Sequence, residues 1–381
     1  RNVGVKMNKK LIYIFIAIAI IVTVFIIKIP KKDTKITYDN NLYSNKVISN
    51  KYIEKGINLK VEIHDIINPK LLIKSSKKLK ELEFNKLNDN LYDIDINIEE
   101  LNNDQYELYI ENNNIAYPLI NDLDILEKLN RSKIGSKLIT FSYDNMGFKI
   151  EDFNYEYDIF IDPGHGGKDS GTYNSLINED DLNLKQSLYE KQRYEEHGLK
   201  VLMSRSDETD GMLYDNQDWN RAKRRAYLLG YYGVTAKIIY SNHHNSTTNN
   251  TTSGYEILVS NSYTKDDLKT ELKIVDELNK KYPKELINNP YQIYSRDYEE
   301  GTGYNKINGK VYDYRDYYAT IRIPLELFNV KTVTYEGCYM SNKENFNWYY
   351  NEGWKMMSEI KIKHYVESLG KTYIPISWKM C

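Results

Sequence analysis

Three polar side chains in the second half of the chain form a set that can bind a metal ion. His165 lies in the sequence DPGHGG, Glu179 in NEDDLN and His243 in SNHHN. Two imidazoles and a carboxylate are the ligand set of hydrolytic zinc sites, in which one coordination position stays open for water. A fourth side chain, Glu336, ends a later predicted strand in TYEG and supplies the carboxylate that such a site needs to move protons.

Each candidate ligand lies in a different local sequence. Pro and Gly residues surround His165, so the backbone turns sharply after a strand and allows another group to approach closely. His243 directly follows a predicted apolar strand and is itself followed by His244. Successive residues of an extended segment point to opposite sides, so only one of these two histidines can face a metal. Glu179, taken alone, is better explained as an acidic residue in the first turn of a helix.

Strand and helix patterns alternate from about residue 155 and provide the elements that position these residues. Gly198 ends one predicted helix, and Thr264 with Asp267 forms a partial capping box at the start of another. The pattern predicts a three-layer αβα domain over residues 155–381, an α/β fold in which strand ends supply the site. The strands are expected at 158–162, 199–204, 236–241, 254–259 and 331–336, and the helices at 182–197, 219–232, from 264 onwards and at 345–369.

Residues 51–150 show a different periodicity. Apolar and polar residues alternate in short runs, which is typical of half-buried strands. The sequence DNMG at 144–147, between two such runs, indicates a hairpin. We therefore expect a small β-rich domain at 51–150, preceded by a polar linker at 30–50. This domain contains no motif with chemistry, so a stalk or spacer is the default interpretation of its role.

The N-terminal segment 7–29 is nearly apolar between residues 11 and 27 and has lysines on both sides. The apolar run is slightly short for a full membrane span, although within the observed range. No Ala-x-Ala-like cleavage site follows it, so a retained membrane anchor is favoured over a cleaved signal segment. We expect an N-terminal transmembrane helix in a single-pass protein of the cell membrane, with the C-terminal domain extracellular. Secretion after signal cleavage is the alternative.

Composition excludes several classes of protein. Of the 381 residues, 41% are hydrophobic and 28% charged, which is ordinary for a globular protein with a substantial core. A net charge of −2 gives no electrostatic case for nucleic acid as a partner. The two cysteines, Cys338 and Cys381, are too few for a disulfide framework, and they form no Cys-x-x-Cys motif of the kind used by structural zinc sites.

Four motifs, in order and in matching strand and helix context, resemble those of the zinc-dependent N-acetylmuramoyl-L-alanine amidases. They read DPGHGGKDSG, EDDLNL, SNHHN and EGCYMSN, and the resemblance covers about residues 157–369. The resemblance implies that His165, Glu179 and His243 bind Zn²⁺ and that Glu336 is the catalytic carboxylate. It also implies the reaction, which is hydrolysis of the amide bond between N-acetylmuramic acid and L-alanine in peptidoglycan.

The chain departs from the family pattern at three places. His244 stands where a small residue is usual, and the segments 208–218 and 260–331 look longer than usual. These departures affect the expected pocket and substrate preference rather than the metal ligands. Two interpretations of His244 stay open, a surface histidine or a side chain that assists the oxyanion. The sequences RSD at 205–207 and RAKRRA at 221–226 also look like family features.

Two other functions stay open. One is a zinc peptidase that cuts within the stem peptide, and the other is a non-catalytic wall-binding or regulatory protein that keeps the amidase fold. The complete set of His165, Glu179, His243 and Glu336 argues against the second, because degenerate copies usually lose one of these residues. The expected partners are peptidoglycan and, through the N-terminal helix, the membrane, and no nucleic-acid partner is expected.

Overall fold

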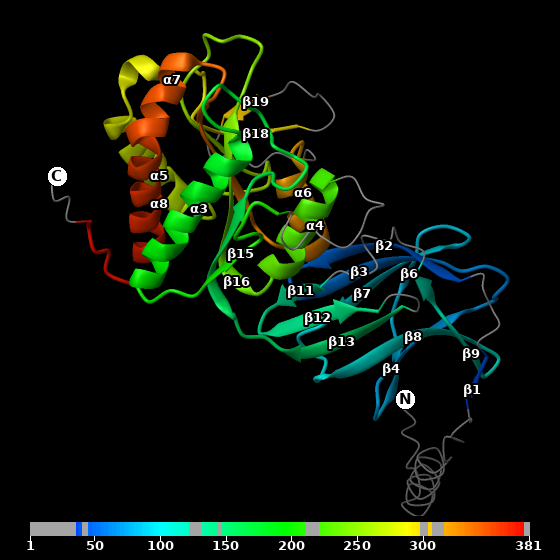
Figure 1. Ribbon diagram of the computed structural model, residues 1–381. Coiled ribbons are helices and arrows are strands. Elements are labelled where there is room, and N and C mark those ends of the chain that lie inside the picture. Colours follow the sequence, from blue (N-terminus) through cyan, green and yellow to red (C-terminus); the bar gives the residue numbers. More distant parts are fainter. Residues whose placement is uncertain are drawn as a thin grey trace, which may run out of the picture.

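A computed structural model describes residues 36–39, 45–121, 131–142, 146–209, 221–297, 304–306 and 316–376. The membrane segment expected at 7–29 lies outside these residues, as does part of the linker expected at 30–50. None of the helices in the described ranges combines the length and the apolar character needed to cross a bilayer. Two regions of different architecture follow one another along the chain, a β-rich region (Thr37–Asp152) and an α/β region (Tyr157–Ser368) (Figure 1).

Two sheets packed face to face form the β-rich region. Its strands are β1 (Thr37–Tyr38), β2 (Lys46–Ile53), β3 (Gly56–Glu62), β4 (Lys70–Lys74), β5 (Leu79–Leu82), β6 (Asn85–Lys86), β7 (Leu91–Asn97), β8 (Asp104–Asn112), β9 (Ile115–Pro118), β10 (Ile120–Asn121), β11 (Arg131–Ile134), β12 (Lys137–Phe141) and β13 (Gly147–Asp152). One sheet runs β1-β9-β8-β13-β12-β11, with β4 beside β8 and β5 beside β4, and the other runs β10-β2-β3-β7-β6. Alternate residues such as Leu59 and Ile94 point inwards from the strands and share one apolar core.

A seven-stranded sheet with helices on both faces forms the α/β region. Its order is β15 (Val201–Met203), β14 (Tyr157–Pro163), β16 (Ala236–Asn245), β20 (Val333–Tyr339), β17 (Glu256–Leu258), β18 (Ile293–Arg296) and β19 (Tyr304–Lys306). The first four strands are parallel, and β17 is antiparallel to β20. The carboxyl ends of β14, β16 and β20 therefore meet at one edge of the sheet, where ligands bind in open α/β sheets.

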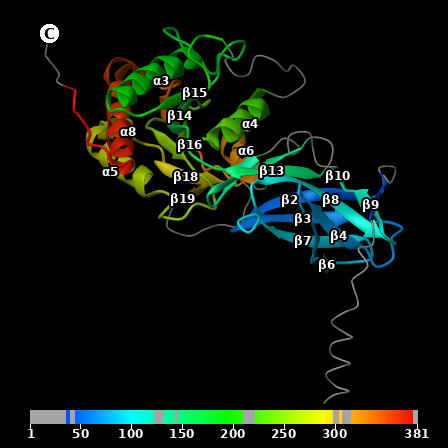
Figure 2. The ribbon, with the colours of Figure 1, turned by 90° about the horizontal axis from the view of Figure 1, so that it is seen from below.

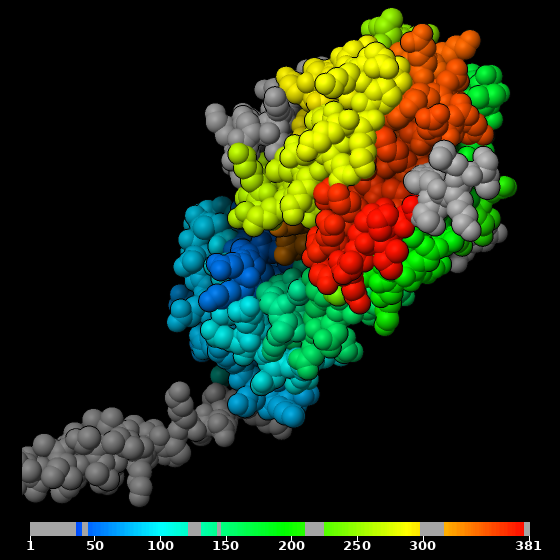
Figure 3. Space-filling model, turned by 90° about the vertical axis from the view of Figure 1, so that its left-hand side faces the viewer, coloured from blue at the N-terminus to red at the C-terminus, as the bar shows by residue number. Residues whose placement is uncertain are grey.

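Successive residues of the central strands face opposite sides of this sheet. Ile161 and Tyr240 belong to the core under α3 (Glu179–Glu196), α5 (Lys269–Lys281) and α8 (Trp354–Ser368), whereas Phe160 belongs to the core under α4 (Arg221–Gly233) and α6 (Ala319–Phe328). Figure 1 shows the two helix layers on either side of the sheet, and Figure 3 shows α5, in yellow, beside α8, in red. The expected mixed α/β fold is confirmed.

Several element boundaries differ from those expected. Helix α3 begins at Glu179, three residues before the predicted start, so the candidate ligand is itself helical. Thr264 and Asp267 do bond to each other, but they close a turn, and α5 begins only at Lys269. The predicted final helix is divided into α7 (Lys343–Trp348), a π-helical turn (Tyr349–Gly353) and α8. Helix α6 and strands β18 and β19 were not predicted, and a short 3-10 helix covers Lys284–Leu286.

The β-rich region lies directly against helices α4 and α6. The Tyr52 hydroxyl donates to the Leu327 carbonyl at 2.9 Å, and Arg131 Nε donates to the Tyr231 carbonyl at 2.7 Å. The Arg131 guanidinium also stands 4.1 Å from the centre of the Tyr231 ring. Leu138 of β12 packs against the apolar core of these two helices. Figure 2 shows the β-rich region against α4 and α6 from below. The α4–α6 layer is therefore enclosed between the sheet and the sandwich.

Candidate metal centre

The backbone around His165 is shaped to bring three side chains together. Strand β14 ends at Pro163, and His165 then adopts a φ of +60°, which is uncommon for a residue with a side chain. Glycines leave the space that the neighbouring groups occupy. A Cβ atom on Gly164 would overlap the His243 ring, and one on Gly171 would overlap the His165 ring and the Glu179 carboxylate. Pro and Gly around His165 thus have the role that the sequence predicted.

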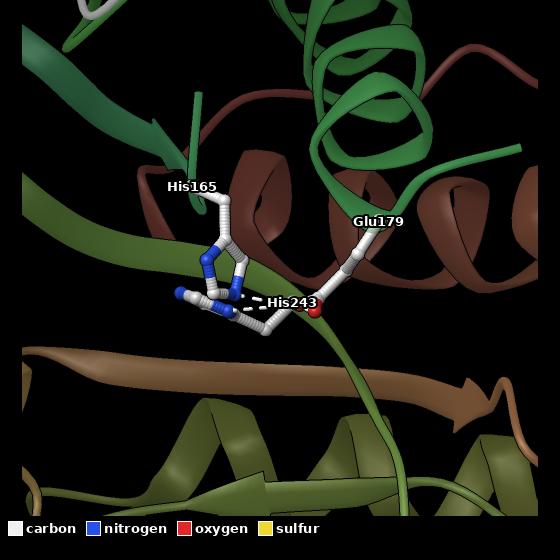
Figure 4. Close-up of side chains that lie close together, drawn as sticks. All are labelled: His165, Glu179 and His243. Atoms are coloured by element: carbon white, nitrogen blue, oxygen red, sulfur yellow. Dashed lines mark hydrogen bonds and ion pairs between the residues drawn. The ribbon is translucent and has the colours of Figure 1, made fainter. Parts of the chain in front are cut away.

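His165, Glu179 and His243 converge on one point (Figure 4). One ligand atom of each lies within 4.8 Å of those of the other two. His165 Nε2 is 3.2 Å from Glu179 Oε2, and His243 Nδ1 is 3.1 Å from Glu179 Oε1. Two ligands bonded at about 2.05 Å to a tetrahedral ion are about 3.3 Å apart. The donor set is one that zinc uses, and both histidine–glutamate distances are close to this spacing.

Glu179 is fixed by its place at the first residue of α3. It is 4% exposed, and its carboxylate accepts hydrogen bonds from the Thr172 and His244 amides, both at 3.0 Å. Burial raises the pKa of Glu179, but the hydrogen bonds from His165 and His243 outweigh it, so the pKa lies well below its usual value. The helix N-terminus also favours the anion. Glu179 is therefore ionised, as a metal ligand must be.

A second carboxylate orients the His165 ring. Asp169 Oδ1 lies 3.0 Å from His165 Nδ1, on the opposite side of the ring from Glu179. This contact fixes a proton on Nδ1 and leaves Nε2 free to bind a metal, as in the carboxylate–histidine–metal arrangements of other proteins. Burial lowers the pKa of His165, but Glu179 and Asp169 together raise it above its usual value. Asp169 lies within the first motif, but no pattern in the sequence distinguished it.

Two arginines hold the loop that carries His165. Arg205 donates to the carbonyls of Pro163 and Gly164 at 3.1 and 3.0 Å, and Arg225 donates to those of Pro163, at 2.7 Å, and His165. The buried Asp162 carboxylate, 3.1 Å from Arg225, balances part of this charge. Three successive carbonyls thus point at two guanidinium groups. Both arginines stand in sequences that looked like family features, but their contacts are with backbone atoms and were not predictable.

His244 is buried rather than exposed. It is 2% exposed, and its Nδ1 lies 2.7 Å from Asn183 Oδ1. Burial lowers the pKa of His244 to about 3, so the ring is neutral. His244 therefore lies in the interior, behind Glu179. Neither expectation for it, a surface histidine or an oxyanion contact, is met. The prediction that the two adjacent histidines face opposite ways holds, although His243 lies within β16 rather than after it.

Glu336 stands on β20 between two residues of neighbouring strands. Its register partners are His243 of β16 and Glu256 of β17. Its Oε2 atom is buried and has no hydrogen-bond partner among the described residues. Burial, together with the negative charges of Glu179 and Glu256, holds the pKa of Glu336 well above its usual value. The residue is thus close to the metal ligands and is not engaged elsewhere.

Glu256 was not identified from the sequence. It is 5% exposed, and its carboxylate accepts hydrogen bonds from Asn245 at 2.7 Å, Tyr294 at 3.0 Å and Tyr339 at 2.5 Å. These donors satisfy Glu256 fully, in contrast to Glu336 beside it. Only the pairing of β17 with β20, which a single sequence does not reveal, brings the two carboxyl groups together.

Two histidines at the carboxyl edge of an α/β sheet, with a glutamate from the first turn of α3, form a candidate metal centre of the hydrolase type. The family model described as N-acetylmuramoyl-L-alanine amidase matches residues 159–363, more than half of the chain. The chain therefore belongs to the N-acetylmuramoyl-L-alanine amidase family.

The sequence of one curated relative is similar to part of this chain. The germination-specific N-acetylmuramoyl-L-alanine amidase of Bacillus subtilis (strain 168) is 28% identical over 125 residues, which is 32% of this chain and 52% of that protein. The chain thus matches about half the length of this curated relative.

Three solved structures are similar to part of this chain. The catalytic domain of CwlV, an amidase of Bacillus (Paenibacillus) polymyxa var. colistinus, is 19% identical with a TM-score of 0.40 over 56% of this chain and 98% of its own. The N-acetylmuramoyl-L-alanine amidase of Clostridium difficile 630 is 23% identical, with a TM-score of 0.40 over 57% and 98%. Cwp6 of Clostridium difficile is 21% identical, with a TM-score of 0.39 over 56% and 29%.

Proposed function

We propose that the chain hydrolyses the amide bond between N-acetylmuramic acid and L-alanine in peptidoglycan, with Zn²⁺ held by His165, Glu179 and His243. The observation that carries this proposal is the convergence of the three ligand atoms within 4.8 Å, in a segment that the amidase family model matches. Zinc bound at such a site supplies a water of lowered pKa and polarises the carbonyl that is attacked.

Glu336 is the residue proposed to move the protons. It accepts the proton of the attacking water as a general base and returns it to the departing amine of L-alanine as a general acid. An amine that leaves without this proton is a poor leaving group. The burial of Oε2 and its lack of a hydrogen-bond partner leave this atom free for the transfer.

The other residues of the site keep the ligands in place. Asp169 holds His165 in the tautomer that presents Nε2, and Arg205 and Arg225 hold the loop on which His165 stands. Asn183 connects the Gly164 carbonyl, 3.1 Å from its Nδ2, with the His244 ring. The site is therefore formed before substrate arrives, which reduces the reorganisation needed in the transition state.

Analysis of digested peptidoglycan tests this function. The full-length protein is incubated with purified cell wall, and the soluble products are identified by mass spectrometry, with and without a chelator. An amidase releases intact stem peptides with a new L-alanine amine. Fragments cut within the stem would instead support the peptidase alternative. A zinc-loaded protein that binds wall and releases nothing would support the non-catalytic alternative.

We also propose that the protein acts outside the cytoplasm, anchored at the cell membrane. The support is the apolar run at 11–27 with lysines on both sides, together with the extracellular position of the proposed substrate. Cell fractionation with N-terminal sequencing tests this proposal. An intact N-terminus in the membrane fraction is expected, and a soluble form that begins near Lys31 would show signal cleavage instead.

A further inference from the structure

The segment between the first two candidate ligands displays two large apolar side chains to solvent. Tyr173 is 76% exposed and Leu176 is 61% exposed. We call Thr172–Asn178 the ligand-proximal loop. Ile177 of the same loop packs against the main apolar core, so the loop buries one apolar side chain and presents two others outwards.

The ligand-proximal loop is ordered by hydrogen bonds at both ends. The Glu179 amide donates to the Thr172 carbonyl at 2.8 Å, and Tyr173 forms a β-bridge with Asn178. Within the loop, Asn174 Oδ1 accepts from the Leu176 amide at 2.8 Å, which closes an Asx-type turn. Tyr173 and Leu176 are therefore exposed on a fixed backbone, so little conformational entropy is lost when a ligand covers them.

The loop touches the metal centre directly. The Thr172 amide donates to Glu179 Oε2 at 3.0 Å, and Gly171 lies against Glu179 and His165. Consecutive Cα atoms are about 3.8 Å apart, so Tyr173 stands one residue away from a group that contacts a ligand oxygen. The exposed Tyr173 is therefore next in the chain to a residue that contacts the candidate metal centre.

The order of the strands in the sheet indicates which part of the substrate extends towards the ligand-proximal loop. Glu336, which protonates the departing amine in the proposed function, lies on β20, and β14 lies on the other side of β16. The stem peptide, which carries the amine, therefore extends towards β20. The acyl part, which is the lactyl group and its sugar, extends towards β14 and α3, where the ligand-proximal loop joins them.

We propose that Tyr173 and Leu176 form a subsite for the apolar face of the muramoyl sugar ring, with the Tyr173 ring stacked on the pyranose C–H groups. The proposal rests on the proposed function, because it takes the direction of the substrate from the role of Glu336. An exposed aromatic ring offers a large apolar face at low entropic cost, and a pyranose ring presents a matching one. Covering these faces removes apolar surface from water.

The test compares two substrates with the same scissile bond. N-acetylmuramoyl-L-alanyl-D-isoglutamine carries the sugar, and lactoyl-L-alanyl-D-isoglutamine lacks it. For Tyr173→Ala we expect KM for the first to rise about tenfold, with kcat nearly unchanged and no effect on the second. Tyr173→Phe should retain wild-type KM, because the ring rather than the hydroxyl makes the contact. Ile67→Ala removes an apolar side chain that is 84% exposed in the β-rich region and serves as the control.

Binding measurements test the proposed subsite separately from the proposed catalytic function. In Glu336→Gln protein with equal zinc content, calorimetry should show that Tyr173→Ala weakens binding of the sugar-bearing compound only, also by about tenfold. Equal loss with both compounds, or no loss with either, would overturn the subsite. If wild-type protein releases no stem peptides from purified cell wall, the proposed function is wrong, and the calorimetric comparison still decides whether Tyr173 contacts the sugar.

Discussion

The β-rich region and the α/β region both have apolar cores, but they differ in how many polar and charged side chains they bury. Among the described residues of the β-rich region, the buried polar side chains are Asn45, Glu111 and Ser132. The α/β region buries many more, including the ion pair of Glu190 and Lys361, both side chains of which are inaccessible to solvent. Buried charge is costly unless it is paired, so its concentration in one region indicates where the chemistry takes place.

The buried pair stabilises the strand that carries a ligand. Lys361 Nζ is 2.7 Å from Glu190 Oε1 and donates to Asn242 Oδ1 at 2.6 Å, while Asn242 Nδ2 donates to Glu190 Oε2 at 2.8 Å. Asn242 directly precedes His243 on β16. Polar groups in the core of the α/β region thus form one connected network that ends beside the metal centre. The apolar sandwich of the β-rich region has no counterpart of this network among its described residues.

The largest expected effect is on kcat, and it compares Glu336 of the α/β region with Glu111 of the β-rich region. Glu336→Gln should lower kcat by about 10²–10⁴-fold and leave zinc binding unchanged, because it removes proton transfer but not a ligand. Glu111→Gln is the matched control, since Glu111 is 7% exposed and pairs with Lys70 at 3.3 Å. It should leave kcat unchanged. Steady-state kinetics and metal analysis check both, and substantial hydrolysis by Glu336→Gln would remove this residue from the proton-transfer role.

Removal of one partner of the buried pair tests the role of paired charge. Lys361→Met should lower the free energy of unfolding by about 3–5 kcal/mol, because Glu190 is left charged and unpaired in the core. The double variant Glu190→Gln, Lys361→Met should recover much of this loss, because no charge is then buried. Urea unfolding of the three proteins measures the difference. An equal loss in the single and double variants would show that packing, not charge, explains the effect.

Asp169 tests whether orientation of a ligand affects metal affinity. Asp169→Asn should weaken zinc binding by about 10–100-fold, because the amide holds the His165 tautomer less strongly. Asp104→Asn, in the β-rich region, is the control; Asp104 accepts from the Ser76 hydroxyl at 2.6 Å, far from any metal ligand. Competition with a chelating dye measures both affinities. Unchanged affinity in Asp169→Asn would mean that the contact with His165 is incidental.

The smallest expected effect is on the pH dependence of the free energy of unfolding, through Glu277 at the contact between α5 and α8. Burial raises the pKa of Glu277, but Lys281 and Lys363 outweigh it and lower the pKa to about 2. The folded-state value is below the unfolded one, near 4.3, so this stabilisation is present above pH of about 4.3 and is lost as the pH falls towards 2. Glu277→Gln should cost less than about 1 kcal/mol at pH 7. Urea unfolding should show the difference from wild type shrinking between pH 5 and 3, and a difference that grows on acidification would contradict this account.

The sequence was most informative about short motifs at strand ends. His165, Glu179 and His243 are brought together because parallel strands place their carboxyl ends at one edge, so strand order was not needed to expect their proximity. The mixed α/β fold followed from the same alternation of strands and helices.

Features that depend on tertiary pairing were not predictable. Glu256 lies beside Glu336 only through the β17–β20 register, and the arginines bond to carbonyls that no side-chain pattern reveals. The burial of His244 depends on Asn183, one turn into α3. The contact of the β-rich region with α4 and α6 joins Tyr52 to Leu327, residues far apart in sequence. In each case the missing information is which distant element packs against the residue.

Zinc analysis of purified protein, paired with His243→Ala, shows whether His165, Glu179 and His243 bind the metal ion on which hydrolysis depends. We expect about one zinc ion per wild-type chain, loss of that ion in the variant, and loss of wall hydrolysis whenever the metal is removed. A chain stripped of metal that still releases intact stem peptides from peptidoglycan would contradict it.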